Sequence, residues 1–427
     1  MADTAANTCD DPDIALREGS IWKRLGELIS LFFVIGATGF GGPAVLIAMI
    51  EDAVVRRRRW ISRQYFLDLV GATNLIPGPN AVEMSIHIGF IRAGVPGLLV
   101  AGISFVVPAV TITTIVAWAY VRFGSLPSVT PFLYGVKPAI VAVILAAVWR
   151  LGKPAVKTWK LAVIGAVVLA VTLLGVNEIG AMFAGGILGM IWLRLSAAAK
   201  TPPDTNELPR KLPAIAWLGI GKVGLVGLAG SVAAAATIVP LSLWRLGLFF
   251  LKVGAVLYGS GYVLVAFIQR GLVDNLGWLT QQQLLDAVAA GQITPGPFTS
   301  TAAFVGYFLL GVPGAIVAAV AIFLPSFVFT WILNPIVPKL RKSQWTAAFL
   351  DAINVASVAL MLAVTIELAN STLIGWPLGA ATWLRWPAWI LAVAASFIAL
   401  RWPISPTWIV LGGALIGWVL GRFTGYM

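Results

Sequence analysis

Charged residues are scarce in this 427-residue chain: Asp, Glu, Lys and Arg together make up 11% of it, where a soluble domain has about 25%. Hydrophobic residues make up 59%, and the mean hydropathy is +0.93. So few charges cannot cover a water-facing surface, which excludes a soluble globular protein. The composition predicts an all-α polytopic integral membrane protein, because helices satisfy their own backbone hydrogen bonds in lipid.

Cysteine and histidine are almost absent, with Cys9 and His87 as the single residue of each type. This excludes an intrachain disulfide and a metal site made of clustered Cys and His residues. The sequence also has no Gly-x-Ser-x-Gly motif and no nucleotide-binding loop. We therefore expect no catalytic site, no metal, no cofactor and no ATP-driven step in this chain.

The few charges are unbalanced, with 29 Lys and Arg against 17 Asp and Glu and a net charge of +12. The basic residues lie in short loops between apolar runs, where they mark the cytoplasmic face of a membrane protein rather than a nucleic-acid partner. The N-terminal segment is acidic, and the first apolar run is longer than the core of a signal peptide. We expect no cleaved signal.

The chain divides into two similar halves. Residues 36–79 and 254–297 align without gaps and share seventeen identities in forty-four positions, where composition alone gives about four. After a one-residue deletion the match continues, with Gly94 aligned to Gly311 and Pro108 to Pro325. The predicted organisation is an N-terminal tail (1–27), a first transmembrane repeat (28–195), a polar linker (196–213), an extra apolar segment (214–245) and a second transmembrane repeat (246–427).

Loop charges indicate that the two repeats have opposite orientations in the membrane. The loop at 51–63 is rich in arginine, whereas its counterpart at 269–282 has one arginine balanced by Asp274. The bias reverses where 121–131 is compared with 338–343. Equivalent loops on opposite faces produce this alternation, so we predict an inverted repeat and leave the exact number of crossings open.

Each repeat contains a Pro-Gly-Pro triplet inside an apolar region, at 77–79 and 295–297. Two prolines beside a glycine remove backbone donors and end a helix. Breaks at equivalent positions of two repeats are typical of transporter binding sites. The alternative is a pair of kinks that only shape helix packing.

Each break also creates a helix N-terminus, where free N–H groups and the helix dipole favour an anion. Asn80 in the first repeat, and Thr299 and Ser300 in the second, can cap these helices or present polar atoms. A second glycine-rich segment, 39–43 in the first repeat and 257–261 in the second, offers either a close-approach turn or tight packing through small residues.

Ionisable residues inside apolar runs are costly and need a reason. Glu83 follows the first break and is predicted to couple transport to protons or to pair with a cation; the alternative is a residue that reaches the membrane interface. Asp68 and Asp286 precede the two breaks symmetrically and are also predicted coupling residues. Lys137 either neutralises a bound anion or pairs with Glu83 or Asp68. The residues predicted to bind substrate are Gly41, Gly42, Pro77, Gly78, Pro79, Asn80, Lys137, Gly259, Ser260, Pro295, Gly296, Pro297, Thr299 and Ser300.

The sequence resembles the chromate ion transporter family in its long, two-domain form. The resemblance rests on the first-repeat segment 40–43, on Trp60 with Asp68, on the Pro-Gly-Pro triplet with Glu83, and on the second-repeat stretch 283–297. It implies a multi-pass protein of the bacterial inner membrane that exports chromate, with sulfate as a related oxyanion. It further implies energy from the membrane potential or a proton gradient, and halves of opposite orientation.

The second repeat departs from the first at two of these positions. Ser260-Gly261 replaces Gly42-Pro43, and Thr301 replaces Glu83, which argues against equivalent roles for the halves. We predict a secondary transporter that binds chromate or sulfate and works by rocking one repeat against the other. The alternative is a passive anion channel or a membrane scaffold. The expected partners are the oxyanion, the lipid bilayer and protons, without nucleic acid; a homodimer is left open.

Overall fold

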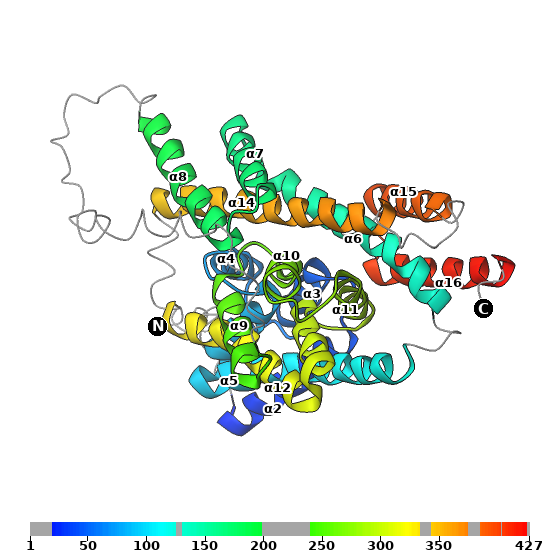
Figure 1. Ribbon diagram of the computed structural model, residues 1–427. Coiled ribbons are helices and arrows are strands. Elements are labelled where there is room, and N and C mark those ends of the chain that lie inside the picture. Colours follow the sequence, from blue (N-terminus) through cyan, green and yellow to red (C-terminus); the bar gives the residue numbers. More distant parts are fainter. Residues whose placement is uncertain are drawn as a thin grey trace, which may run out of the picture.

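Figure 1 presents a computed structural model that describes residues 19–124, 130–198, 240–333, 343–374, 385–402 and 404–424. Within these ranges the regular elements are all helices. Five of the described helices are long and apolar enough to cross a membrane. The predicted all-α, multi-pass class is therefore confirmed.

The two repeats contain the same succession of helices. The first repeat consists of α2 (Ile21–Thr38), α3 (Pro43–Glu51), η1 (Asp52–Arg57), α4 (Arg63–Thr73), α5 (Asn80–Phe123), α6 (Thr130–Ala155), α7 (Trp159–Leu173) and α8 (Glu178–Ala198). The second consists of α9 (Leu243–Val256), α10 (Val263–Ile268), η3 (Gln269–Asn275), α11 (Gln281–Ile293), η4 (Phe298–Ser300), α12 (Thr301–Leu333), α14 (Gln344–Ala369), η5 (Asn370–Ile374), α15 (Arg385–Arg401) and α16 (Pro406–Thr424). Helix α2 begins inside the stretch that the sequence assigns to the N-terminal tail. Of the predicted linker and extra apolar segment, residues 199–239 lie outside the described residues.

Local sequence explains where several of these helices begin. The Ser62 and Thr280 hydroxyls, at equivalent positions of the two repeats, accept hydrogen bonds from the third backbone N–H of α4 and α11. Gln283 completes a capping box with Thr280. Pro43 occupies the first position of α3, where its missing N–H has no cost.

Helices α5 and α12 each contain a sharp turn at equivalent positions. Ala93 and Gly94 leave the helical conformation in α5, and Leu310 and Gly311 do so with nearly the same dihedral angles in α12. Beyond the turn of α5, the chain packs back on itself, because a Cβ on Gly89 would overlap the backbone at residue 97. Each of the two helices is therefore a helical hairpin, and small residues let its arms approach closely.

The helices form two groups. The core group contains α2 to α5 and α9 to α12; the panel contains α6 to α8 and α14 to α16, and Figure 1 shows it above the core. Within the panel, the helices of one repeat pack on a helix of the other. Helices α7 and α8 of the first repeat pack on α14 of the second, whereas α15 and α16 of the second repeat pack on α6 of the first. Each group therefore contains helices from both repeats.

Apolar stripes cover the outside of the helices. On α5, Leu99, Ile103 and Val107 are exposed at every fourth position. The equivalent face of α12 is formed by Val312, Ile316, Val320 and Leu324, which are also exposed. Residues four apart lie on one face of a helix, and soluble proteins do not expose such stripes. These faces are therefore suited to contact lipid.

Candidate functional site

The two Pro-Gly-Pro breaks meet in the core group and bond reciprocally to the other repeat. Gly78 N–H donates to the Leu257 carbonyl at 2.7 Å, and Gly296 N–H donates to the Gly39 carbonyl at 2.9 Å. Leu257 and Gly39 are themselves equivalent, since each ends the first helix of its repeat. The two Pro-Gly-Pro breaks and the two glycine-rich segments at 39–43 and 257–261 therefore converge at one place.

Glycine is required at the centre of each triplet. Gly78 and Gly296 have φ values of 153° and 91°, in the region that favours residues without a Cβ. A methyl group on Gly78 would overlap the Glu83 carboxylate and the Ser326 hydroxyl, and one on Gly296 would overlap the Ala109 methyl. The triplets are buried and hold the neighbouring helix ends in place.

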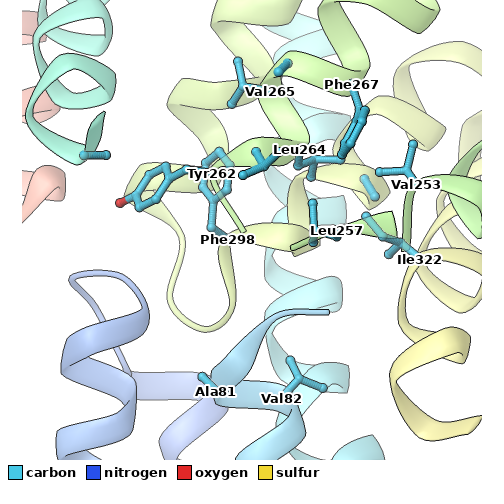
Figure 2. Packing of buried hydrophobic residues seen from close by; sticks show 14 of the residues in the cluster. Ala81, Val82, Val253, Leu257, Tyr262, Leu264, Val265, Phe267, Phe298 and Ile322 are labelled. Atoms are coloured by element: carbon cyan, nitrogen blue, oxygen red, sulfur yellow. The ribbon is translucent and has the colours of Figure 1, made fainter. Parts of the chain in front are cut away.

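Buried apolar residues of both repeats surround the breaks. Figure 2 shows Ala81 and Val82 at the start of α5, with Leu257 and Phe298 of the second repeat close by. The Tyr262 and Phe298 rings stack with centroids 4.9 Å apart. This apolar packing fixes the short segments that contain no helix.

A cavity of about 270 Å³ lies between the core group and the panel, next to these breaks. The core side contributes Gly41, Pro43, Ala44, Ile47, Asn80, Gly259, Ser260, Gly261 and Tyr262. The panel side contributes Val143, Ala146, Ala147, Arg150, Leu151, Ala399, Ile404, Pro406 and Ile409. Ligand pockets for drug-sized molecules are about 300–1,000 Å³, so this volume suits a small ion.

The chemistry of the cavity favours an anion. Pro43 and Ala44 begin α3, and Asn80 begins α5, so two helix N-termini open into it. Arg150 supplies a cation from α6. Within the described part of the chain, its hydrogen bonds are both donated by Nη2, to the Ala399 carbonyl at 2.7 Å and the Trp402 carbonyl at 3.2 Å. A guanidinium has five N–H donors, so Nε and Nη1 are available to a ligand.

A second cavity of about 240 Å³ adjoins the first and shares Leu151, Gly259 and Ser260 with it. Its lining is more polar and includes Asn74, Asn354 and Ser357. Lys157 and Asp351 also line it and form an ion pair at 2.6 Å. The two cavities therefore lie side by side along the boundary between the core group and the panel.

The predicted substrate residues fall into two sets. Gly41, Asn80, Gly259 and Ser260 line the first cavity, and a Cβ on Gly42 would lie 3.2 Å from the Tyr262 hydroxyl at its edge. The two Pro-Gly-Pro triplets are buried behind it and do not line either cavity. Their role in the described structure is to position the helix ends that do.

Lys137 lies apart from the cavities. It is 9% exposed and interacts electrostatically with Asp286, which is 6% exposed. Asp286 also accepts a hydrogen bond from the Tyr120 hydroxyl at 2.6 Å. Since α6 belongs to the panel and α11 to the core group, this electrostatic interaction connects the two groups. Asp286 was not among the partners of Lys137 that the sequence suggested.

The remaining predicted residues lie on other faces of the breaks. Thr299 and Ser300 are buried in η4, and the Ser300 hydroxyl lies 3.0 Å from that of Thr113. Asp68 is partly buried on α4 and lines none of the described cavities. Glu83 is fully buried in the first turn of α5, directly behind the cavity-lining Asn80.

Arg150 and Tyr262 are the site residues that sequence reasoning missed. Arg150 was counted with the basic loop residues that mark topology, because it stands at the start of a charged segment. A signal was nonetheless present, because the repeat alignment places Glu367 opposite Arg150. A reversal of charge at equivalent positions indicates a role that only one repeat performs.

The Glu367 carboxylate is engaged in contacts within the protein. It pairs with Arg270, which also bonds to Asp274 and to the Thr172 carbonyl. The second-repeat position that corresponds to Arg150 is therefore part of an ion pair between η3 and α14. Phe298 similarly takes the place of Asn80. Arg150 and Asn80, which both line the first cavity, therefore have no counterpart of the same chemistry at the equivalent positions of the second repeat.

Two repeats of membrane-spanning helices, with paired breaks beside a small cationic cavity, define the class of a polytopic membrane transporter. A family model described as "Chromate transporter" matches residues 26–190 and 244–418, one match in each repeat. The chain belongs to the chromate transporter family.

Named relatives agree with this assignment. The chain is 32% identical to a chromate transport protein of Cupriavidus metallidurans, over 92% of this chain and 93% of the relative. It is 32% identical to a probable chromate transport protein of Synechococcus elongatus, over 82% and 86% of the two chains. A chromate transport protein of Pseudomonas aeruginosa is 29% identical over 92% of each chain. No solved structure matches the chain significantly.

Proposed function

We propose that this protein transports chromate across the plasma membrane and binds the oxyanion in the 270 Å³ cavity between the core group and the panel. The observation that carries the proposal is the meeting of Arg150 with the N-termini of α3 and α5 in that cavity. The relatives named as chromate transport proteins support the choice of substrate.

The electrostatics suit a tetrahedral dianion. Each helix N-terminus contributes up to about 2 kcal/mol to anion binding in a partly buried setting, and Arg150 adds a charge-assisted hydrogen bond. Sulfate has the same shape and charge, and backbone N–H groups bind either ion. We therefore propose sulfate as a competing ligand of the same cavity.

The two repeats have opposite orientations in this proposal. The reciprocal hydrogen bonds of Gly78 and Gly296 support a twofold relation between the repeats. Gly102 of α5 contacts Phe327 of α12, and Val110 packs against the cluster that contains Ala319. These contacts imply that two equivalent helices run antiparallel, as repeats inverted across the membrane require. The alternating loop charges give separate support.

Alternating access follows from movement of the core group against the panel. Each group contains helices of both repeats, so this movement differs from the predicted rocking of one repeat against the other. The cavity lies on the boundary between the groups, where a relative shift would open it first to one face and then to the other. The membrane potential or a proton gradient supplies the energy, and Glu83 is the proposed coupling residue.

Uptake of labelled chromate by proteoliposomes that contain the purified protein tests this function. We expect saturable uptake that an imposed gradient drives above equilibrium and that sulfate inhibits. Collapse of the gradient should return the internal concentration to equilibrium. Flux that never exceeds equilibrium would identify a passive channel, and the absence of flux would reject the transport function.

A further inference from the structure

We propose that Glu83 of the first repeat and Ser326 of the second form one proton-binding site, whose proton travels with the bound oxyanion. This inference deepens the transport function proposed above and rests on it. In this site Ser326 is the hydrogen-bond partner of Glu83, and the described residues contain one such site. Binding of the proton and binding of the oxyanion favour each other.

The two side chains converge on one point between the repeats. A single methyl group placed on Gly78 would overlap both Glu83 Oε1 and Ser326 Oγ. Both residues are 0% exposed, and among the described residues neither carboxylate oxygen nor the Ser326 hydroxyl has a hydrogen-bond partner. Thr330, one turn further along α12, is equally buried and its hydroxyl is also without a partner.

Such an arrangement fits a carboxyl group that gains and loses a proton. An ionised carboxylate buried without a partner is very costly, whereas a protonated one has an O–H that a serine hydroxyl accepts. After deprotonation, the same hydroxyl rotates and donates to the carboxylate. Ser326 is therefore a suitable partner for both forms of Glu83, and the proton itself leaves to water.

The charges around Glu83 support a proton rather than a fixed counter-ion. The elements packed against it contribute the Tyr258 phenol, which interacts electrostatically with Glu83, and the uncharged Ser326 and Thr330 of α12. On its own helix, His87 lies one turn away and Arg92 is engaged with Glu27. Within the described chain, Arg92 is therefore already paired with another acid.

The equivalent place, beside Gly296, lacks both members of the pair. Thr301 replaces Glu83, and its hydroxyl donates to the Phe298 carbonyl at 2.7 Å. Ala109 replaces Ser326, with its methyl group beside Gly296. The neighbouring Thr113 is bonded to Thr294. Acid and hydroxyl are thus present together beside Gly78 and absent together beside Gly296, which is expected of a functional pair.

Position explains how the proton and the oxyanion influence each other. Asn80 lines the anion cavity and Glu83 lies in the first turn of the same helix. A negative Glu83 would compete with a dianion for the positive end of that helix. Protonation of Glu83 therefore favours oxyanion binding, and by linkage the oxyanion favours protonation. A dianion that moves with one proton carries a net negative charge, so an interior-negative potential drives its export.

The test measures chromate affinity and proton movement in proteoliposomes over a pH range in which chromate stays a dianion. For the unaltered protein we expect affinity to fall as pH rises through the titration of Glu83, and chromate uptake to carry protons in the same direction. Glu83→Gln should bind chromate with no pH dependence and move no protons. Glu83→Asp should restore both, which separates the loss of an acid from damage to folding.

Ser326→Ala should raise the midpoint of the pH dependence by about 0.5 to 1 pH unit, since the hydrogen bond that Ser326 donates to the ionised carboxylate is stronger than the one it accepts from the protonated form. Thr365→Ala is the matched control, because Thr365 is a buried hydroxyl bonded to its own helix on α14; its midpoint should not move. An unchanged midpoint in Ser326→Ala would remove Ser326 from the site.

The outcomes distinguish this inference from the function on which it rests. Chromate transport by the unaltered protein, with the same pH dependence and proton movement in Glu83→Gln, would overturn the proton site and leave transport standing. Uptake that requires Na⁺ and moves no protons would also overturn it. Failure of the unaltered protein to transport chromate would reject the transport function itself.

Discussion

At the scale of single residues, the proposed anion site depends on which cation faces the cavity. Two candidates lie on α6, separated by several turns. Arg150 lines the cavity, whereas Lys137 lies beside Asp286 in the buried contact between α6 and α11. We therefore propose that the first acts on the substrate and that the second stabilises the packing of the core group against the panel.

Replacement of Arg150 should weaken chromate binding. Loss of a hydrogen bond to a charged group costs about 1.5–3 kcal/mol, so Arg150→Ala should raise the KM for chromate about 10- to 100-fold. Arg150→Lys keeps the charge but loses the planar donor set and should have a smaller effect. Arg245→Ala, on an exposed arginine of α9, is the control in the same uptake assay. An unchanged KM for Arg150→Ala would exclude Arg150 from the site.

Replacement of Lys137 should affect stability instead. Lys137 and Asp286 are both buried and interact electrostatically, so removal of one charge leaves the other uncompensated, which costs up to about 3–5 kcal/mol where the charges form a close pair. Lys137→Met should therefore lower the unfolding temperature in detergent, and adding Asp286→Asn should recover part of the loss. The KM for chromate should stay the same in whatever protein remains folded. A raised KM at normal stability would instead place Lys137 at the substrate.

At the scale of elements, the helix breaks decide where the helix N-termini lie. Each Pro-Gly-Pro segment is held by one backbone hydrogen bond to the opposite repeat and by close packing around its glycine. The Pro-Gly-Pro triplets do not form the cavity wall. They place the first turns of α3 and α5 beside α6, and the cavity results from that placement.

Alanine substitutions should separate backbone strain from crowding at these breaks. Gly78 and Gly94 both have positive φ, but a Cβ on Gly94 meets nothing within 4 Å. Strain alone costs about 1–2 kcal/mol, so Gly94→Ala should lower stability moderately and keep transport. Gly78→Ala must also displace Glu83 and Ser326 and should lose transport. Measurements of uptake per folded molecule and of the unfolding midpoint test the predictions for both variants. Normal uptake by Gly78→Ala would contradict the proposed role of the break.

At the scale of the whole molecule, the exchange of helices between repeats determines which parts can move together. The core group and the panel are joined by Arg270 with Glu367 and by Lys137 with Asp286. A hydrogen bond from the Thr407 hydroxyl to the Gln292 carbonyl adds a third link. These contacts cross the boundary that contains the cavity, so they must change if the two groups shift during transport.

Cross-linking should detect that shift. The chain has one cysteine, so Cys9→Ser supplies a cysteine-free background. Cysteines at positions 270 and 367, joined by a reducible bifunctional thiol reagent, should abolish uptake until a reductant is added. The control pair at positions 27 and 92 replaces another ion pair, but both residues belong to the core group; its cross-link should leave uptake intact. Undiminished uptake with 270 joined to 367 would contradict movement at this boundary.

Sequence alone determined the class of this protein, its duplication and the places where its helices break. Few charges and long apolar runs identify a membrane protein because each residue contributes its own free energy of transfer into lipid. Helix breaks can be predicted because proline and glycine change the backbone at their own positions. The repeat was visible because two copies preserve the same local pattern. These properties depend on neighbours in the chain, so they can be predicted without knowing the fold.

Only the tertiary structure decided which side chains share a site. Arg150, Asn80 and Ser260 meet because α6 packs against the breaks of both repeats, and Ser326 faces Glu83 because α5 and α12 cross between the repeats. The packing of α7 and α8 of the first repeat on α14 of the second likewise cannot be predicted from the local sequence. Such meetings depend on long-range packing between segments far apart in the chain, and neither composition nor periodicity specifies which buried charge faces which cavity.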